Sequence, residues 1–236
     1  MGACGSSPAY DTSLIKTIVK GDAAKLAALL LSPTVDINQT DSTGWTPLIH
    51  AVSLNKPEMV SQLLKHDEID PNQADRNGRG PLDYAARGNL PEPAQLLVDH
   101  DRCDPNQQNN GGGTALHVAS QENHPDIVRI LLAHLQLKVN LVTNDGASAL
   151  FIAAERGHER VVQLLLGNVE IDVNLAMPWK LQGATVDATP LFAATFQEAQ
   201  PIVDLLVAHP GIEIPRYSQV AACQQDESTE QVEMAI

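Results

Sequence analysis

Apolar and polar positions along this 236-residue chain repeat in register with a period of 34 residues. A glycine opens each copy of the pattern, a leucine follows four positions later and an alanine seven positions later. These positions are Gly44, Gly78, Gly112 and Gly146, then Leu48, Leu82, Leu116 and Leu150, then Ala51, Ala85, Ala119 and Ala153. A fixed step of this length indicates one structural unit that is copied several times along the chain.

Each copy of the pattern predicts two short helices. In the first full copy, turn-forming residues lead to Thr46 and Pro47; the threonine hydroxyl can cap free backbone amides, and proline suits the first helical position. A second helix begins at Pro57, and its apolar side chains, which include Leu63 and Leu64, recur at helical spacing. Because neither helix could bury its apolar stripe alone, the copies are predicted to stack into an all-α solenoid.

The segments GWTPLIHA, GGTALHVA, GHERVVQLLL and IDVN resemble the ankyrin repeat. The resemblance implies an ankyrin repeat solenoid of stacked helix-turn-helix units, with β-turns or hairpins projecting as fingers. It extends over residues 11–216, and the last unit carries seven extra residues before Thr189. The first and last units depart most from the pattern, as capping units do. The units are 11–40, 41–74, 75–108, 109–142, 143–176 and 177–216.

The charge and the cysteines limit the classes of partner and compartment. A formal net charge of −14 argues against nucleic acid, because phosphate binding needs a basic surface. Cys103 occupies an apolar register and is expected in the core, whereas Cys4 and Cys223 stand in opposite tails. This distribution suggests no disulfide framework and fits a reducing cytoplasmic compartment. The longest apolar run, residues 26–31, is too short to cross a bilayer.

The first ten residues are expected to form a flexible segment that begins Met-Gly-Ala-Cys-Gly-Ser. This start resembles an N-myristoylation site, with Gly2 exposed after removal of the methionine. One myristoyl chain binds a membrane only weakly, and Cys4 stands where a second, palmitoyl chain is often added. Lipidation would place the protein at the cytosolic face of a membrane. The alternative is a plain terminus of small residues.

Residues 217–236 form an acidic tail with few apolar anchors, and we expect this tail to be disordered. The simplest interpretation is a solubilising tail. A glutamate-rich C-terminus is also similar to the export signals of type IV-secreted bacterial effectors, some of which carry ankyrin arrays and eukaryotic lipidation sites. The final Met-Ala-Ile could instead offer a carboxylate and apolar anchors to a sheet-edge peptide binder.

The histidines share a register but do not suggest a metal site. Equivalent positions in stacked helices lie about 8–10 Å apart, too far for joint ligation of zinc. We expect these histidines near the ends of second helices, where imidazole can meet free carbonyls. They are His66, His100, His134 and His209. The sequence also contains no His-Glu-x-x-His, Cys-x-x-Cys or Gly-x-Ser-x-Gly motif, so we expect no enzyme, no metal and no cofactor.

Positions that the repeat leaves free are the candidates for partner binding. In ankyrin-type arrays the turns form fingers and the first helices a palm. Tryptophan and arginine often dominate interface energy. We therefore expect one patch at Trp45, Arg79 and Arg87, and a second at Trp179 and Phe196. The other candidates are Ser53, Leu54, Gln121, Glu155 and Arg156.

Both tryptophans also have a purely structural interpretation. Trp45 could cover the neighbouring turn, and Trp179 could pack locally against Met177 or Leu181 within the inserted residues. The sequence leaves these alternatives open.

The sequence as a whole predicts a non-catalytic, monomeric protein that binds another protein, as a membrane-tethered adaptor or inhibitor. One alternative is a secreted bacterial effector whose array binds a host protein inside the host cell. The other is a soluble stoichiometric inhibitor of a kinase or a transcription factor.

Overall fold

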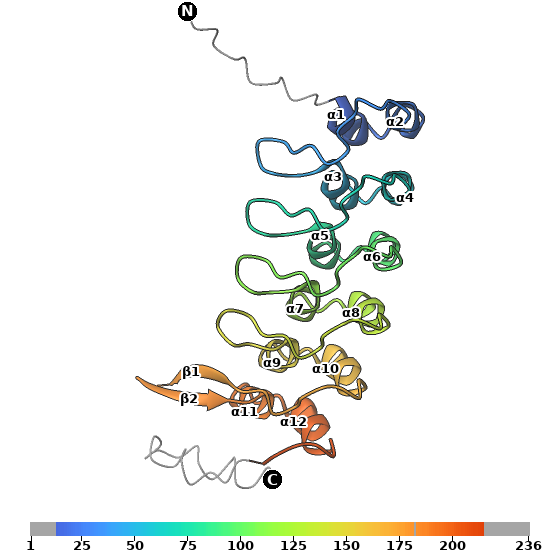
Figure 1. The fold of residues 1–236 in the computed structure, drawn as a ribbon. Coiled ribbons are helices and arrows are strands. Elements are labelled where there is room, and N and C mark those ends of the chain that lie inside the picture. The colour runs from blue at the N-terminus through green and yellow to red at the C-terminus, as the bar shows by residue number, and fades with distance from the viewer. Residues whose placement is uncertain (1–12, 182, 215–236) are drawn as a thin grey trace, which may run out of the picture.

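Six stacked helix pairs make up most of the computed structural model, which describes residues 13–181 and 183–214 (Figure 1). The first helices of the pairs contact one another in one layer and the second helices in another. The first helices are α1 (Ser13–Lys20), α3 (Pro47–Ser53), α5 (Pro81–Arg87), α7 (Ala115–Gln121), α9 (Ala149–Glu155) and α11 (Pro190–Phe196). The second helices are α2 (Ala23–Leu30), α4 (Pro57–Leu64), α6 (Pro91–Val98), α8 (Pro125–Leu132), α10 (Glu159–Leu166) and α12 (Gln200–Val207). The predicted solenoid is confirmed.

Hydroxyl caps fix where several helices begin, and left-handed glycines shape the turns before them. The Thr46 hydroxyl accepts the Ile49 N–H at 3.1 Å, and the Thr189 hydroxyl accepts the Phe192 N–H at 3.2 Å. Each turn glycine of the 34-residue pattern has a positive φ, between +74° and +89°, which few other residues tolerate. The sequence signals for turn and helix start therefore act as expected.

The core is a continuous apolar layer between the two rows of helices. It contains the leucine and the alanine of every copy, for example Leu116 and Ala119 of α7. Cys103 is buried in this core, as its register predicted, and burial raises the pKa of its thiol to about 12. The thiol is therefore protonated and poorly reactive in the folded protein.

An asparagine in each loop joins one helix pair to the next. The Asn72 amide nitrogen donates to the Arg102 carbonyl at 2.7 Å, and its oxygen accepts the Asp104 N–H at 2.8 Å. The same two bonds recur in every rung of this asparagine ladder, at Asn38, Asn72, Asn106, Asn140 and Asn174. The recurrence of asparagine in the sequence therefore has a direct structural cause.

Three of the fingers, at residues 75–79, 109–113 and 143–147, are joined by a second set of bonds. The Asn110 N–H donates to the Asn77 carbonyl at 3.0 Å, and the Asn144 N–H donates to the Gly111 carbonyl at 2.9 Å. Pro178 stands 34 residues after Asn144 and has no N–H to continue the series.

The last finger is instead an antiparallel hairpin of β1 (Met177–Leu181) and β2 (Ala184–Ala188), which contains the inserted residues. It reaches beyond the loops of the preceding repeats (Figure 1).

Several sequence predictions concern residues outside the described part of the chain. Gly2, Cys4 and the tail 217–236 belong to this group, and the boundaries assigned to the six units stay predictions. Among the described residues, no helix has both the length and the apolar character that are needed to span a bilayer.

Candidate functional site

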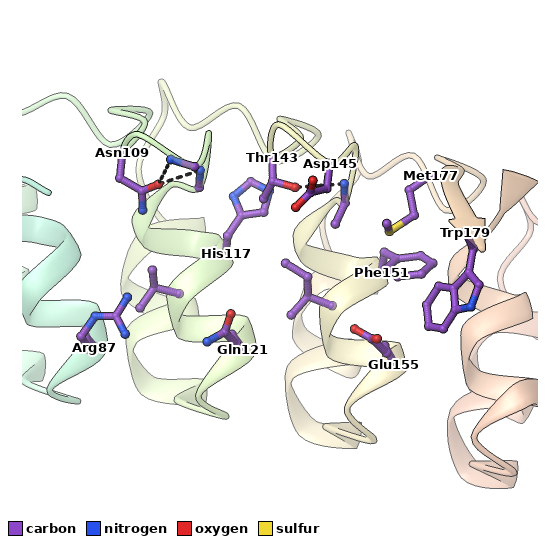
Figure 2. Close-up of a pocket in the computed structure, with 15 residues that line it drawn as sticks. Arg87, Asn109, His117, Gln121, Thr143, Asp145, Phe151, Glu155, Met177 and Trp179 are labelled. Atoms are coloured by element: carbon purple, nitrogen blue, oxygen red, sulfur yellow. Dashed lines mark hydrogen bonds between the residues drawn. The ribbon is translucent and has the colours of Figure 1, made fainter. Parts of the chain in front are cut away.

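A groove of about 350 Å³ lies between the first helices and the fingers of the central repeats (Figure 2). Arg87, Gln121 and Glu155 come from the ends of α5, α7 and α9 and lie in one row along its lower side. Phe151 and Trp179 lie together at the end towards the hairpin. The groove therefore has a polar side and an aromatic end.

Small residues at the finger bases leave room for the groove. Gly113 and Ala147 line it, and they occupy the register in which earlier repeats have Trp45 and Arg79. Larger side chains at these two positions would project towards the same space. The repeat fixes the backbone here, but the opening depends on the choice of glycine and alanine.

Arg87, the single arginine among the described residues that line the groove, is already paired. Its Nε lies 3.8 Å from Oδ1 of Asp83, and its NH1 group lies 3.9 Å from Oε1 of Glu122. Asp83 is buried, and burial raises the pKa of its carboxyl despite a hydrogen bond from Asn109 and the charge of Arg87. Arg87 therefore already faces two carboxyl groups of the protein itself.

Two carboxylates of the groove have no such compensation. Asp145 and Glu155 make no side-chain hydrogen bond or ion pair with any other described residue, and both line the groove. His117 also lines it, and burial lowers the pKa of its imidazole, so the ring is neutral at physiological pH. The unpaired charge of the groove is consequently negative.

The aromatic end belongs to a larger ring cluster that bridges two repeats and the hairpin. The ring of Trp179, on β1, lies 5.6 Å from Phe151, 6.5 Å from Phe192 and 6.1 Å from Phe196. These four residues, called the aromatic cluster below, include all three phenylalanines of the chain. Phe151 is 1% exposed and Phe196 is 49% exposed, so the cluster runs from the core to the surface.

The other tryptophan has a different environment. The Trp45 ring lies 5.2 Å from His50 and 4.7 Å from Tyr84 of the following repeat. The Tyr84 hydroxyl donates to Asp75 at 2.7 Å, and burial together with this carboxylate raises the pKa of Tyr84 to about 12. Trp45 thus packs on the neighbouring repeat, in line with its structural interpretation, and is half-buried.

The groove collects only some of the residues that the sequence proposed for binding. It contains Arg87, Gln121, Glu155 and Trp179, while Phe196 contacts Trp179 in the aromatic cluster. The remaining candidates lie outside the groove and are Trp45, Ser53, Leu54, Arg79 and Arg156. The predicted pair of Trp179 and Phe196 is in contact. Of the predicted patch of Trp45, Arg79 and Arg87, only Arg87 lines the groove.

Sequence reasoning missed several groove residues, above all Phe151. One signal was available, because Phe151 and Phe192 stand in the register of His117. The three repeats before Phe151 carry Ile49, Asp83 and His117 at this position, so an aromatic ring in two consecutive repeats is a departure that the sequence displays.

The aligned histidines bind backbone, but not in the way that the sequence analysis expected. The Nδ1 atom of His134 accepts the Gln136 N–H at 3.1 Å, and His66, His100 and His209 do the same for the residue two positions later. Their structural role is confirmed, while the prediction that they meet free carbonyls is wrong. Among the residues that the structure covers, no group of histidine, cysteine and carboxylate side chains could hold a metal ion.

Stacked helix pairs with projecting fingers define a helical repeat protein. A family model described as ankyrin repeats, in three copies, matches residues 14–109 and 91–177. The chain belongs to the ankyrin repeat family. A search of curated proteins found no match.

Three solved structures show how far the similarity extends. EF0377, an ankyrin repeat protein, is 25% identical, with 84% of this chain and 98% of that chain covered and a TM-score of 0.74. The ankyrin repeat domain ABAYE2397 from Acinetobacter baumannii AYE is 28% identical, with coverage of 84% and 98% and a TM-score of 0.73. The ankyrin repeat domain of Bcl-3, a member of the IkappaB protein family, is 26% identical, with 88% of each chain covered and a TM-score of 0.74. None of these matches indicates an enzymatic family.

Proposed function

We propose that this ankyrin repeat protein binds a segment of another protein in the groove, without catalysis and as a monomer. The aromatic cluster carries the proposal: Trp179 and Phe196 remain partly exposed beside a hollow, although the helix stack itself needs no aromatic residue there. Exposed aromatic side chains in a preformed concave site are typical anchors for a partner.

Site-specific photo-crosslinking tests this proposal. A benzophenone amino acid at Gln121 lies in the groove, and the same group at Gln136 lies at an exposed position outside it. We expect one discrete crosslinked protein from position 121 and none, or only a diffuse background, from position 136. Identical products from both positions would refute binding in the groove.

The patch around Trp45 stays a separate proposal with its own test. Once a partner has been crosslinked, its affinity is measured for Trp45→Ala and Arg79→Ala. Unchanged affinity in both variants would remove that patch from the binding surface.

We further propose that acylation tethers the protein to the cytosolic face of a membrane, where it acts as an adaptor or inhibitor. The support is the sequence around Gly2 and Cys4, since two acyl chains together give stable anchoring. Intact mass spectrometry after expression in a eukaryotic cell tests it, beside Gly2→Ala and Cys4→Ser. Loss of both acyl masses in Gly2→Ala is the expected result, and an unmodified wild-type terminus would refute the tether.

A bacterial effector is the second candidate function, favoured by the acidic tail together with the array and the lipidation sequence. The tail, residues 217–236, is fused to a reporter and tested for translocation by a type IV system. A reporter that stays in the donor cell would exclude the effector. The membrane-tethered adaptor or inhibitor and the soluble inhibitor would then remain as candidates.

A further inference from the structure

We propose that the groove selects a basic segment with an apolar anchor, that is, a leucine or aromatic side chain flanked by lysine or arginine. This inference rests on the proposed function and specifies the chemistry of the partner. It is carried by two independent properties of the groove, its aromatic end and its unpaired negative charge.

The aromatic end provides the site for the apolar anchor. Trp179, Met177 and Ile152 are partly exposed there, and the buried Phe151 packs against Trp179. A volume of about 350 Å³ is at the small end of the range for binding pockets, roughly 300–1,000 Å³, and suits one or two side chains better than a large ligand. Burial of an apolar side chain here removes water from the exposed part of Trp179.

The charges around this end favour flanking cations. Asp145 and Glu155 are unpaired among the described residues, Arg87 already faces Asp83 and Glu122, and the ring of His117 is neutral. An acidic segment would therefore meet two carboxylates, and none of the described residues that line the groove offers a free cation to offset them, whereas a basic segment would be attracted.

The neighbouring lysine does not change this balance. Lys180 follows Trp179 on β1, and successive side chains of a strand point to opposite faces. Lys180 does not line the groove.

The same charges disfavour a second copy of the chain as the occupant. Each copy carries a formal net charge of −14, so that two copies repel each other at low ionic strength. A basic segment of a different protein gains from the same long-range field. Charge complementarity thus distinguishes the two possible occupants.

Peptide titration monitored by Trp179 fluorescence tests the inference. The Trp45→Phe background leaves Trp179 as the reporter, because the chain has two tryptophans. The probes are three blocked peptides, Lys-Lys-Leu-Phe-Lys-Lys, Glu-Glu-Leu-Phe-Glu-Glu and Lys-Lys-Ser-Ser-Lys-Lys. We expect the first peptide to bind at least about tenfold more tightly than either of the others, with an affinity that falls as salt rises.

Neutralising variants show whether the two carboxylates are responsible. Asp145→Asn combined with Glu155→Gln is expected to weaken the first peptide by about tenfold. Glu92→Gln, an exposed carboxylate on α6 outside the groove, is the matched control and should leave binding unchanged. Far-UV circular dichroism confirms that each variant is folded.

Several results would overturn the inference. One is equal binding of the basic and acidic peptides, and another is no loss of binding in the double variant. The third is a change of Trp179 fluorescence on concentration-dependent dimerisation without peptide. If no peptide binds while Gln121 still crosslinks one protein, the inference fails and the proposed function stands. If the crosslink is also absent, the proposed function fails as well.

Discussion

Replacement of Asn106 by alanine removes one complete rung of the asparagine ladder at the centre of the stack. The Asn106 amide nitrogen donates to the Gln136 carbonyl at 2.8 Å, and its oxygen accepts the Lys138 N–H at 2.7 Å. A neutral hydrogen bond contributes about 0.5–1.5 kcal/mol net, so that two of them contribute roughly 1–3 kcal/mol. Because these bonds are exposed and water can replace them, we expect a loss of about 1–2 kcal/mol.

Urea unfolding followed by circular dichroism measures this loss as a lower transition midpoint. Gln136→Ala is the matched control, since Gln136 contributes only its backbone carbonyl to the rung. Asn106→Asp keeps the acceptor but puts a carboxylate oxygen against the Gln136 carbonyl, and we expect it to be at least as destabilising as alanine. Equal midpoints for all three variants and the wild type would refute a stabilising role of the ladder.

The remaining predictions concern a crowded turn and the hydrogen-bonded carboxylate of Asp41. In Gly112→Ala the new Cβ would lie 2.6 Å from the Asn144 backbone nitrogen, whereas Gly157→Ala has a similar positive φ and nothing within 4 Å. We expect Gly157→Ala to lower the free energy of unfolding by about 1 kcal/mol through backbone strain alone, and Gly112→Ala to lower it clearly more. Equal losses of stability in thermal denaturation would contradict the crowding argument. Burial acts to raise the pKa of Asp41, but hydrogen bonds from Thr43, His50 and the Trp45 backbone outweigh it and lower the pKa to about 2 from 3.8. The stabilisation by Asp41 is therefore complete above about pH 4 and is lost as the pH falls towards 2. Thermal melts between pH 2 and 7 should show that the melting temperature of Asp41→Asn falls less steeply at acid pH than that of the wild type. An unchanged fall in melting temperature would exclude these hydrogen bonds as a cause of acid destabilisation.

The repeat period allowed the fold to be predicted because each signal acts locally. A capping threonine such as Thr46 and a turn glycine such as Gly112 determine helix starts and turns within a few residues. The apolar register then determines which face is buried, as Cys103 illustrates. These relations depend on neighbours in sequence or on the same position one repeat away, which the sequence displays directly.

The candidate site was harder to predict, because it depends on contacts between different registers. The aromatic cluster brings Trp179 of the hairpin against Phe151 of one repeat and Phe192 of the next, and no spacing rule links the tryptophan to the register that the two phenylalanines share. The histidines illustrate the same limit at short range. His134 could have met a carbonyl or an amide, and only the path of the loop towards Gln136 selects the amide.

The missing N–H of Pro178 leaves the last finger outside the hydrogen-bonded series that joins the three fingers before it. A change of length in that series would have to be accommodated by the neighbouring loops. In the hairpin, Trp179 packs in the aromatic cluster, but the tip beyond it is held by the pairing of β1 with β2. Insertions or deletions at its tip near Gly183 can therefore accumulate without disturbing the stack. The length of the hairpin tip can therefore change, by evolution or by design, while the groove keeps its shape.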